Sequence, residues 1–552
     1  MPASPAPVIL HCSTRRLPTI FRALNSNWMQ SPWFRRALAV LAGVALALAF
    51  PRPGLAGLAW VAPALLLLAA RSGRPFRLGY LAGFTHYLVS LAWLLHIPVK
   101  FYPILGWLAL AAYLALFPAA WAWLCVRSAA ARGANPGWLG RTGQAVLCAV
   151  LWVGLEMIIA RLFTGFPWNL LGASQQKLLP LIQIASVTGI MGVSFVVIWF
   201  AASLLNAFDA LLARPADRNV WLKELALPIF AIAILYALGL RSIATAPAPE
   251  RTLRIALIQP SIPQTMIWNS AEAAPRLAEL FQLTEAALTN KPDLVLWPEA
   301  AMPRMLRDDE AAARRIADLA RAHRAWFIIG SDDFDLRGTN IHYYNSSFLV
   351  SPRGEYGPSY RKRRLVIFGE YVPLADWLPF IKWFTPISGG FTPGDRPVSF
   401  PMDTLHATAS VLICFEDVFP HYAREHAGDD VDFLVNITND GWFGEASAQW
   451  QHAASAAYRA VENGRPLVRC ANNGLSCWID RHGGLHNVFF DHSPDIYQAG
   501  YKIVNIPLPA APARTFYTRH GDWFGWFCVV ITGLVAASLL WSDKLAARRG
   551  GQ

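Results

Sequence analysis

The chain has 552 residues, of which 55% are hydrophobic and only 15% are charged, and its mean hydropathy is +0.32. A chain of this length that folds entirely in water is less apolar than this, so a fully soluble protein is excluded. The net charge of +12 at pH 7 does not indicate nucleic-acid binding, because much of the excess lies in loops between apolar segments.

Eight apolar segments are candidates for crossing about 30 Å of hydrocarbon, which takes about 20 residues each. They span 37–50, 54–71, 76–97, 103–126, 143–161, 181–207, 223–241 and 523–541. The first two are short and are separated by Pro51, Arg52 and Pro53, so a hairpin that enters the membrane without crossing it is the alternative for this pair. Segment 1–36 lacks the cleavage pattern of a signal peptide.

Basic residues predict the orientation of these helices, because loops rich in arginine and lysine stay on the cytoplasmic side. They gather in segment 1–36, in alternate loops and in the tail 542–552, as Arg15, Arg16, Arg22, Arg35, Arg36, Arg71, Arg74, Arg77, Arg127, Arg132, Arg141, Arg214, Arg218, Lys223, Lys544, Arg548 and Arg549. We therefore expect cytoplasmic termini, a membrane domain at 37–245, and a domain at 246–515 on the outer face. In a bacterium with two membranes, that face is the periplasm.

The outer domain alternates short apolar runs with stretches of helical periodicity. The runs are typical of strands and lie at Leu253–Ile258, Leu294–Leu296, Trp326–Ile329, Ser410–Ile413, Phe433–Ile437 and Leu467–Arg469. Apolar residues recur at three- and four-residue spacing in 271–289, 308–323 and 446–462, which predicts helices there. This alternation indicates a layered α/β domain with buried sheets.

Chemically reactive side chains follow the strand ends of this domain, in the order Glu299, Lys362 and Cys414. A free thiol has a pKa of about 8.5 and is mostly protonated at neutral pH, so a nucleophilic cysteine needs a base and a nearby cation. Glu299 is the candidate base. Lys362 and the backbone N–H of Phe415 are candidates to stabilise the negative charge of a tetrahedral intermediate.

Each of these patterns alone has a simpler interpretation. A cysteine that ends an apolar strand is usually part of the core. A Trp-Pro-Glu sequence, as at Trp297–Glu299, is usually a capped loop, and a basic run such as Arg361–Arg364 is usually a solvated face. Their occurrence in one domain and in one order favours a catalytic site.

The other six of the seven cysteines indicate no metal site and no disulfide framework, because no CxxC pattern is present. Cys125, Cys148 and Cys528 lie in apolar segments and are expected to be inert, while Cys12 has no partner in view. Cys470 and Cys477 flank a predicted turn between two strands, where a disulfide is conceivable but has no further support.

The ordered set Glu299, Lys362 and Cys414 resembles the nitrilase superfamily of carbon-nitrogen hydrolases. Eight membrane helices with such a domain before the last one resemble, more narrowly, the family of bacterial apolipoprotein N-acyltransferases. Other segments that match this family are Gln259, Ile262–Gln264, Trp268, Thr164–Trp168, Asn439–Gly444, Trp450–His452, Arg465–Pro466 and Asn472–Gly474. The chain departs from the family at Arg364, where histidine is common, and likewise at Ile367 (often proline) and Phe415 (often tyrosine).

The resemblance implies an α-β-β-α sandwich for residues 246–515, in which Glu370 orients Lys362 and Glu416 supports the nucleophile. It also implies an enzyme of the bacterial inner membrane. This enzyme would transfer an acyl chain from a phospholipid, through a thioester on Cys414, to the N-terminal α-amine of a diacylglyceryl-cysteine lipoprotein. It would need neither a metal nor an organic cofactor. The alternatives are a membrane-anchored amidase with water as the acceptor, and a lipid-binding or transport protein without catalysis.

Two tryptophans and one loop are candidates for lipid contact. Trp268 and Trp442 are candidate linings of an acyl-chain pocket, and simple packing is an equal alternative because the chain has 23 tryptophans. The aromatic stretch 377–384, followed by Ser388–Gly390, is interpreted as a mobile lid that dips into the outer leaflet, since tryptophan favours the membrane interface. An internal core loop is the alternative.

Overall fold

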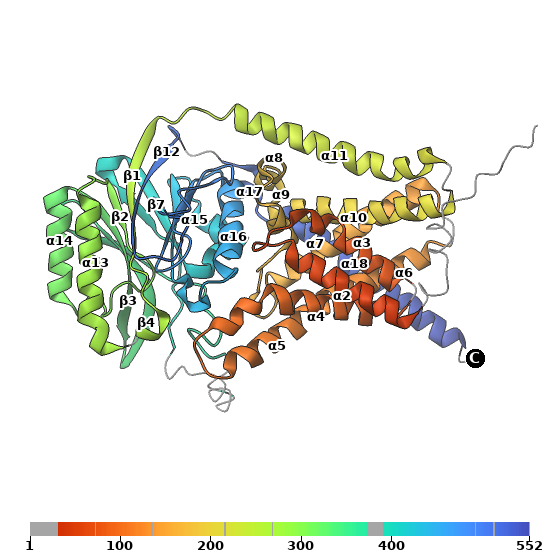
Figure 1. The fold of residues 1–552 in the computed structure, drawn as a ribbon, viewed down its shortest axis with the longest axis horizontal. Helices are drawn as coiled ribbons and strands as arrows, with labels where there is room; N and C mark the ends of the chain where they lie inside the picture. Colours follow the sequence, from red (N-terminus) through yellow and green to blue (C-terminus); the bar gives the residue numbers. More distant parts are fainter. Residues whose placement is uncertain are drawn as a thin grey trace, which may run out of the picture.

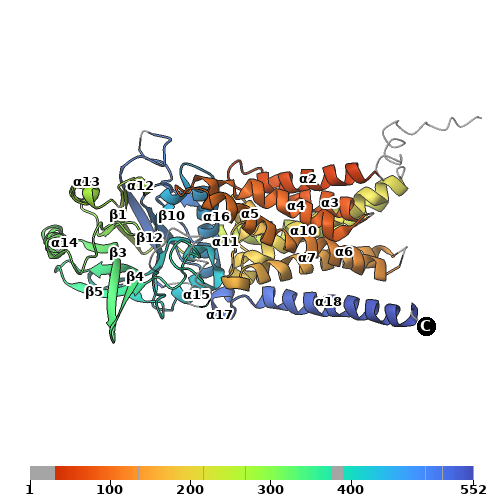
Figure 2. The same cartoon turned by 90° about the horizontal axis from the view of Figure 1, so that it is seen from below.

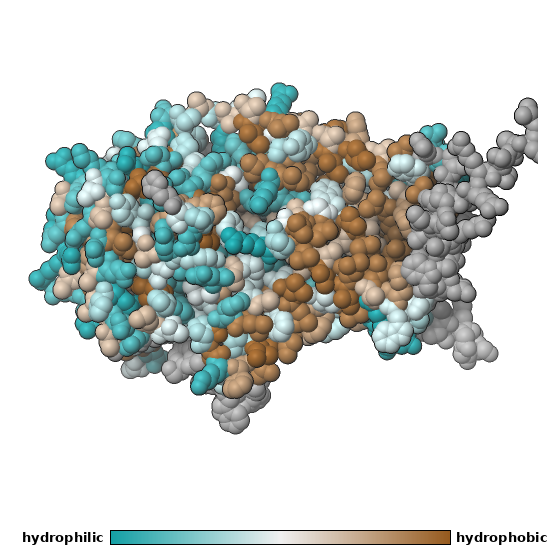
Figure 3. Space-filling view, in the orientation of Figure 1, coloured by the Kyte–Doolittle hydropathy of each residue, from teal (hydrophilic) through white to brown (hydrophobic). Residues whose placement is uncertain are grey.

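The computed structural model describes residues 31–71, 73–133, 136–214, 217–267, 269–373, 377, 390–491, 493–511 and 514–550. They form a bundle of apolar helices joined end to end with a sandwich of two β-sheets (Figures 1 and 2). The chain leaves the bundle through α11 and returns to it through α18. Hydrophobic side chains gather over the helical part and hydrophilic ones over the sandwich (Figure 3).

Apolar helices build the helical part. They are α2 (Pro32–Leu48), α3 (Ala62–Ala70), α4 (Pro75–Ser90), α5 (Tyr102–Leu114), α6 (Leu116–Ala131), α7 (Trp138–Ile159), α10 (Ile190–Ala213), α11 (Arg218–Ala244) and α18 (Trp523–Gly550). Among the described residues, 5 helical stretches are long and apolar enough to cross a membrane: Tyr102–Ala131, Trp138–Ile159, Ile190–Ala213, Asn219–Ala244 and Trp523–Leu545. Helices form at all the expected segments. Eight crossings are not confirmed, because α2, α3 and α4 have 17, 9 and 16 residues and are shorter than the 18 residues taken as the minimum for a crossing.

Backbone breaks explain where the helices differ from expectation. After α2 the chain turns at Pro51–Pro53 and continues as the 3-10 turn Ala56–Trp60, so that α3 has only 9 residues. The expected helix 181–207 is interrupted at Gly189, whose φ of 66° lies outside the right-handed helical region. Within this segment, the short helices α8 (Leu179–Ile182) and α9 (Ala185–Thr188) lie before the glycine, and α10 begins after it.

Glycines let the helices of the bundle approach one another closely, as small residues do in membrane proteins. A Cβ atom built on Gly79 of α4 would lie 2.6 Å from the backbone oxygen of Pro118 and 2.7 Å from the Cα of Ala119, both in α6. These are backbone atoms, which cannot swing aside as the end of a side chain can. The α4–α6 contact therefore requires a residue without a side chain at position 79.

Two six-stranded sheets form the sandwich. The first has the order β12-β1-β2-β3-β4-β5, with β1 (Arg251–Gln259), β2 (Leu294–Leu296), β3 (Trp326–Arg337), β4 (Asn340–Val350), β5 (Tyr356–Arg361) and β12 (Gly500–Leu508). The second has the order β11-β10-β9-β8-β7-β6, with β6 (Ser399–Met402), β7 (Ala407–Ile413), β8 (Phe433–Thr438), β9 (Leu467–Ala471), β10 (Cys477–Ile479) and β11 (Leu485–His486). In each sheet the three central predicted strands pair in parallel.

Helices cover both outer faces of the sandwich, which confirms the layered α/β fold. α13 (Ala273–Leu288) and α14 (Glu310–His323) pack on the first sheet, and α15 (Pro420–His426) and α16 (Ala448–Asn463) lie between the second sheet and the helical part (Figure 1). Buried aliphatic residues of both sheets, such as Ile255, Ile328 and Val435, fill the space between them. The six predicted strands and three predicted helices are all present, and Cys470 and Cys477 are free thiols without a disulfide.

One glutamine side chain ties α16 to the helical part. The Oε1 atom of Gln451 accepts hydrogen bonds from Nε1 of Trp168 at 2.8 Å, Nδ2 of Asn169 at 3.1 Å and Nε1 of Trp93 at 3.2 Å. Its Nε2 atom donates to the backbone oxygen of Ser90 at 3.2 Å. All these groups are buried, so the sandwich is held at a defined position on the helical part rather than tethered by its two linkers alone.

A leucine at position 79 tests the close α4–α6 contact. Gly79→Leu forces the two backbones apart and is expected to destabilise the bundle by about 1–3 kcal/mol, as overpacking of a full core does. Thermal unfolding of the purified protein in detergent measures the fall in the midpoint. Gly106→Leu is the matched control, because no atom lies within 4 Å of a Cβ built there. Equal midpoints for both variants would contradict the packing.

Candidate active site

Cys414 lies where β7 ends and a short 3-10 turn, η9 (Cys414–Val418), begins. Its φ of 55° is in the left-handed region, which is uncommon for a residue with a side chain and costs on the order of 1 kcal/mol or more. The amide of Asn436 on the neighbouring strand β8 donates to the Cys414 backbone oxygen at 2.7 Å and holds this geometry. The buried strand thus ends on a sharp turn that separates the thiol from the strand.

Lys362 follows β5 and carries an ammonium group buried between two carboxylates. Its Nζ donates to Oε1 of Glu299 at 2.9 Å and to Oε1 of Glu370 at 2.8 Å. Glu299 follows β2, so segments from two strand ends of the first sheet meet here. The Lys362 side chain is only 1% exposed, and a charge buried this deeply needs paired opposite charges.

Two asparagines also donate hydrogen bonds to these carboxylates. Nδ2 of Asn345, on β4, donates to Oε1 of Glu299 at 2.7 Å and to Oε1 of Glu370 at 3.0 Å. The backbone N–H of Asn439 donates to Oε2 of Glu299 at 2.9 Å. Sequence reasoning missed Asn345, because the polar strand around it, His342–Ser347, does not indicate which of its side chains faces the site.

Glu416 joins the two sheets beside the nucleophile. Its carboxylate accepts hydrogen bonds from the Tyr360 hydroxyl at 2.9 Å, from the backbone N–H groups of Arg363 and Arg364 at 2.7 and 2.9 Å, and from the backbone N–H of Ile413 at 2.8 Å. Burial raises the pKa of Glu416, whereas these N–H donors lower it. The contacts fix the loop that follows Lys362 against the turn that starts at Cys414.

The site electrostatics keep Cys414 protonated at rest. Burial and the negative charge of Glu299 raise the pKa of the thiol well above its usual value, and the Lys362 ammonium opposes them. Burial lowers the pKa of Lys362, but Glu299 and Glu370 outweigh it, so the pKa is raised and the ammonium stays charged. A thiol of this kind reacts when a base removes its proton during the attack.

Asp332 is a further carboxyl group at this edge that sequence reasoning missed. It lies on β3 directly opposite Asn345, so the two side chains share one face of the first sheet. Burial raises its pKa to about 7, and the negative charges of Glu299 and Glu370 contribute. Asp332 is therefore partly protonated near neutral pH.

A buried charge network lies behind the nucleophile turn. His452 of α16 contacts Asp417 of η9 at 2.6 Å and Asp440 of the turn η10 (Asp440–Phe443) at 2.9 Å. Arg469 on β9 bonds the same two carboxylates at 2.6 and 3.2 Å. The network holds both turns that border Cys414. Burial disfavours the charged imidazole, but Asp417 and Asp440 outweigh it and raise the pKa of His452 to about 9.

Phe415 and Trp442 are the described residues among the aromatic side chains that were expected near the site. Phe415 is half-buried, and its ring lies edge-on to Phe419, with 5.3 Å between the ring centres. Trp442 is half-buried in η10, three residues after Asn439. Trp268 lies outside the described residues. In the expected lid 377–384, only Trp377 is described, with an exposed fraction of 84%.

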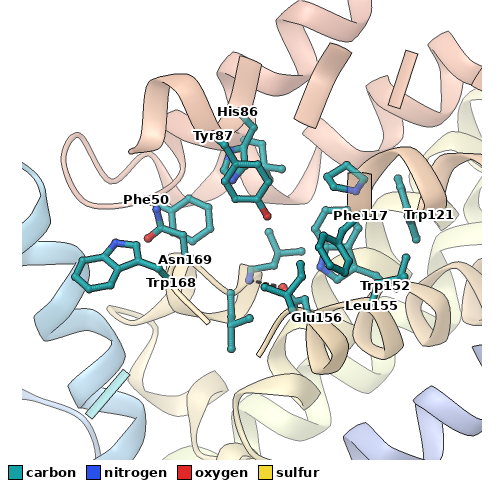
Figure 4. Close-up of a pocket in the computed structure, with 15 residues that line it drawn as sticks. Phe50, His86, Tyr87, Phe117, Trp121, Trp152, Leu155, Glu156, Trp168 and Asn169 are labelled. Atoms are coloured by element: carbon teal, nitrogen blue, oxygen red, sulfur yellow. Dashed lines mark hydrogen bonds between the residues drawn. The ribbon is translucent and has the colours of Figure 1, made fainter. Parts of the chain in front are cut away.

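A separate pocket of about 30 Å³ lies inside the helical part (Figure 4). Aromatic side chains including Phe50, Tyr87 and Trp152 line it, and Trp168 stands at the side of the sandwich. The backbone N–H of Leu171 donates to Oε1 of Glu156 at 2.6 Å. No member of the charge cluster around Lys362 lines this pocket, so it is not the candidate catalytic centre.

Both parts of the chain match known protein families. The carbon-nitrogen hydrolase family matches residues 254–494, and the apolipoprotein N-acyltransferase N-terminal domain matches residues 42–203. A relative from Geobacter metallireducens, named apolipoprotein N-acyltransferase, is 38% identical over 91% of this chain and 94% of its own length. A relative of the same name from Brucella melitensis biotype 1 is 31% identical over 86% of both chains.

Among solved structures, an amidase from Nesterenkonia sp. is similar to part of this chain. The two are 19% identical, and the match covers 48% of this chain and 92% of the amidase with a TM-score of 0.35. This TM-score is too low to assign a function by structural similarity. The sequence matches alone therefore indicate the family.

Glu299→Gln removes both the negative charge of this carboxylate and its capacity to take a proton, and two different measurements report on the two losses. The substitution is expected to lower the pKa of the Cys414 thiol, because the charge of Glu299 is one of the groups that raise it. The rate at which neutral iodoacetamide alkylates Cys414 is measured by mass spectrometry across a pH series. The midpoint of this pH profile should shift to lower pH. Catalysis should nevertheless fall by about 10²-fold or more, because the base is lost. Cys414→Ala gives the background from other cysteines, and an unshifted profile would contradict the assignment.

The His452 network predicts a pH-dependent stability. Because the pKa of His452 is raised from 6.5 to about 9, its contribution is complete below about pH 6.5 and is lost as the pH rises through about 9. The loss is on the order of 3 kcal/mol. Thermal midpoints in detergent between pH 6 and pH 10 measure it. His452→Gln should lower the midpoint at pH 6 and flatten its pH dependence, and an equal slope in both proteins would disprove the contribution.

Proposed function

The chain belongs to the apolipoprotein N-acyltransferase family, whose members acylate the N-terminus of lipoproteins, and we propose that its reaction passes through a thioester on Cys414. In this proposal the acyl donor is a phospholipid, and the acceptor is the α-amine of a diacylglyceryl-cysteine lipoprotein. The observation that carries it is the buried Lys362 ammonium, which contacts Glu299 and Glu370 at 2.9 and 2.8 Å. This charge cluster supplies the base and the cation that the thiol needs.

In the first step, the sulfur of Cys414 attacks the ester carbonyl of the phospholipid while Glu299 takes the thiol proton. The carbonyl oxygen becomes negatively charged, and the Lys362 ammonium and the backbone N–H of Phe415 stabilise it. When the tetrahedral intermediate collapses, the ester bond breaks, and Glu299 returns the proton to the departing alkoxide. The products are a lysophospholipid and the acyl-Cys414 thioester.

In the second step, the neutral α-amine of the lipoprotein attacks the thioester. An α-amino group has a pKa of about 8, so an appreciable fraction is neutral at physiological pH. Glu299 takes a proton from the amine, the carbon–sulfur bond breaks, and the sulfur of Cys414 leaves and regains the proton. The acyl chain is then held by an amide bond, and the enzyme returns to its starting state.

The proposed location is the bacterial inner membrane, with the sandwich in the periplasm. Several basic residues at or near helix ends pair with acids on other elements, namely Arg71 with Asp209 at 2.6 Å, Arg141 with Glu224 at 2.6 Å, and Arg127 with Asp543. The C-terminus lies at the end of the helical part opposite the sandwich (Figures 1 and 2). Basic residues at membrane borders favour the cytoplasmic side, so this basic end is expected in the cytoplasm. The sandwich at the opposite end would then lie on the outer side.

A phospholipid labelled in one acyl chain tests the thioester. Incubation with the purified protein should label the chain covalently, and hydroxylamine should release the label because it cleaves thioesters. Cys414→Ala should remain unlabelled, whereas Cys470→Ala, which changes a buried thiol of the same sandwich, should be labelled normally. Label on Cys414→Ala, or none on the unaltered protein, would refute the mechanism.

The same adduct distinguishes a transferase from an amidase. A transferase adduct should persist in water and decay when a lipopeptide with a free α-amine is added. An adduct that hydrolyses at the same rate with and without the lipopeptide would favour the amidase.

A further inference from the structure

Arg364 lies beside the nucleophile turn. Its backbone N–H donates to Oε1 of Glu416 at 2.9 Å, and Glu416 is two residues after Cys414. The Cζ atom of its guanidinium group lies 4.9 Å from the centre of the Phe419 ring and 6.0 Å from that of the Tyr422 ring. The guanidinium group is thus held on the aromatic side chains at the start of α15.

These aromatic side chains belong to the contact between the sandwich and the helical part. Phe419 is buried in one hydrophobic cluster with Trp93 and Ile159 of the helical part, and Phe415 packs against the same cluster. On the surface, apolar side chains of the helical part give way to polar ones at the junction with the sandwich (Figure 3). In a membrane, the headgroups of phospholipids occupy this level.

Among the residues that the structure describes, no acidic group forms an ion pair with Arg364. Its Nη2 atom is buried and has no hydrogen-bond partner among the described residues. The neighbouring arginines pair with acids, as Arg161 with Asp522, Arg363 with Glu425 at 2.7 Å, and Arg459 with Glu462 at 2.7 Å. Nη1 of Arg363 is also buried without a hydrogen-bond partner in the described part of the chain, so the ion pair is what distinguishes Arg363 from Arg364. A buried donor on a charged group costs free energy until an acceptor reaches it, and a negatively charged acceptor offsets the cost best.

His421 reports the same excess of positive charge. Burial lowers its pKa to about 4, and the positive charges of Arg161, Arg364 and Arg459 contribute, while only Asp522 opposes them. The imidazole is therefore neutral, and its Nδ1 atom is also buried without a partner among the described residues. The ring lies next to Tyr422, with 4.9 Å between the ring centres. This corner of the site combines an unpaired cation with a second unpartnered nitrogen.

We propose that Arg364 binds the phosphodiester of the phospholipid donor while the donor ester reacts at Cys414. The inference rests on the proposed function and assigns its donor subsite. A guanidinium group offers a planar pair of N–H donors that matches phosphate oxygens. The diacylglyceryl acceptor carries no phosphate, so the contact acts in the first half-reaction and not in the second.

Two acyl donors test this subsite. One is a phosphatidylethanolamine in detergent micelles, and the other is p-nitrophenyl octanoate, a neutral ester that acylates a reactive thiol without a phosphate. Arg364→Gln should slow acylation of Cys414 by the phospholipid at subsaturating concentration by about tenfold or more, the range for a lost charged hydrogen bond. Acylation by the neutral ester, and transfer from the preformed acyl-enzyme to a lipopeptide, should change by less than about twofold.

Arg363→Gln is the matched control, because Arg363 also lies over the Tyr422 ring but is paired with Glu425. It should leave phospholipid acylation within about threefold of the unaltered protein. Equal losses with both donors in Arg364→Gln would overturn the inference and give Arg364 a structural role. An unchanged phospholipid rate in that variant, or the same selective loss in Arg363→Gln, would also overturn it. If the unaltered protein forms no acyl-enzyme from phospholipid, the proposed function itself fails.

Discussion

The buried ammonium of Lys362 is the interaction on which the site depends. An unpaired charge at this depth costs several kcal/mol, so Lys362 is tolerated only with Glu299 and Glu370 at 2.9 and 2.8 Å. These carboxylates come from the end of β2 and from the loop after β5, and Asn345 on β4 donates to both. One electrostatic requirement therefore holds several segments of the first sheet at one edge and places carboxylates next to a buried cation.

The second sheet brings Cys414 to this edge, and buried polar contacts continue from there to the helical part. Glu416 binds backbone N–H groups on both sides of the site and so couples the turn at Cys414 to the loop after Lys362. His452 and Arg469 hold the adjoining turns, and Gln451, next to His452, bonds side chains of the helical part. The thiol is thus held in a defined position relative to both the first sheet and the helical part.

The sequence allowed the strand ends to be predicted, because buried apolar runs stop abruptly at Glu299 and Cys414. Asn345 and Asp332 could not be found in this way, since their positions follow from cross-strand register, which a single polar strand does not specify. The number of membrane crossings was also beyond reach, because apolar composition does not distinguish the helix α3 from the 3-10 turn before it. The role of Arg364 depends on the missing partner of one buried atom, which only the three-dimensional structure shows.

Mass spectrometry of the acyl-enzyme tests the central claim, that Cys414 carries the acyl chain, most directly. The protein is incubated with a phospholipid of known chain length, digested, and its cysteine-containing peptides are compared. The account predicts the added mass of one acyl group on the peptide that contains Cys414, with the peptides of Cys470 and Cys477 unmodified. An acyl group on another cysteine, or a Cys414 peptide without added mass during turnover, would contradict it.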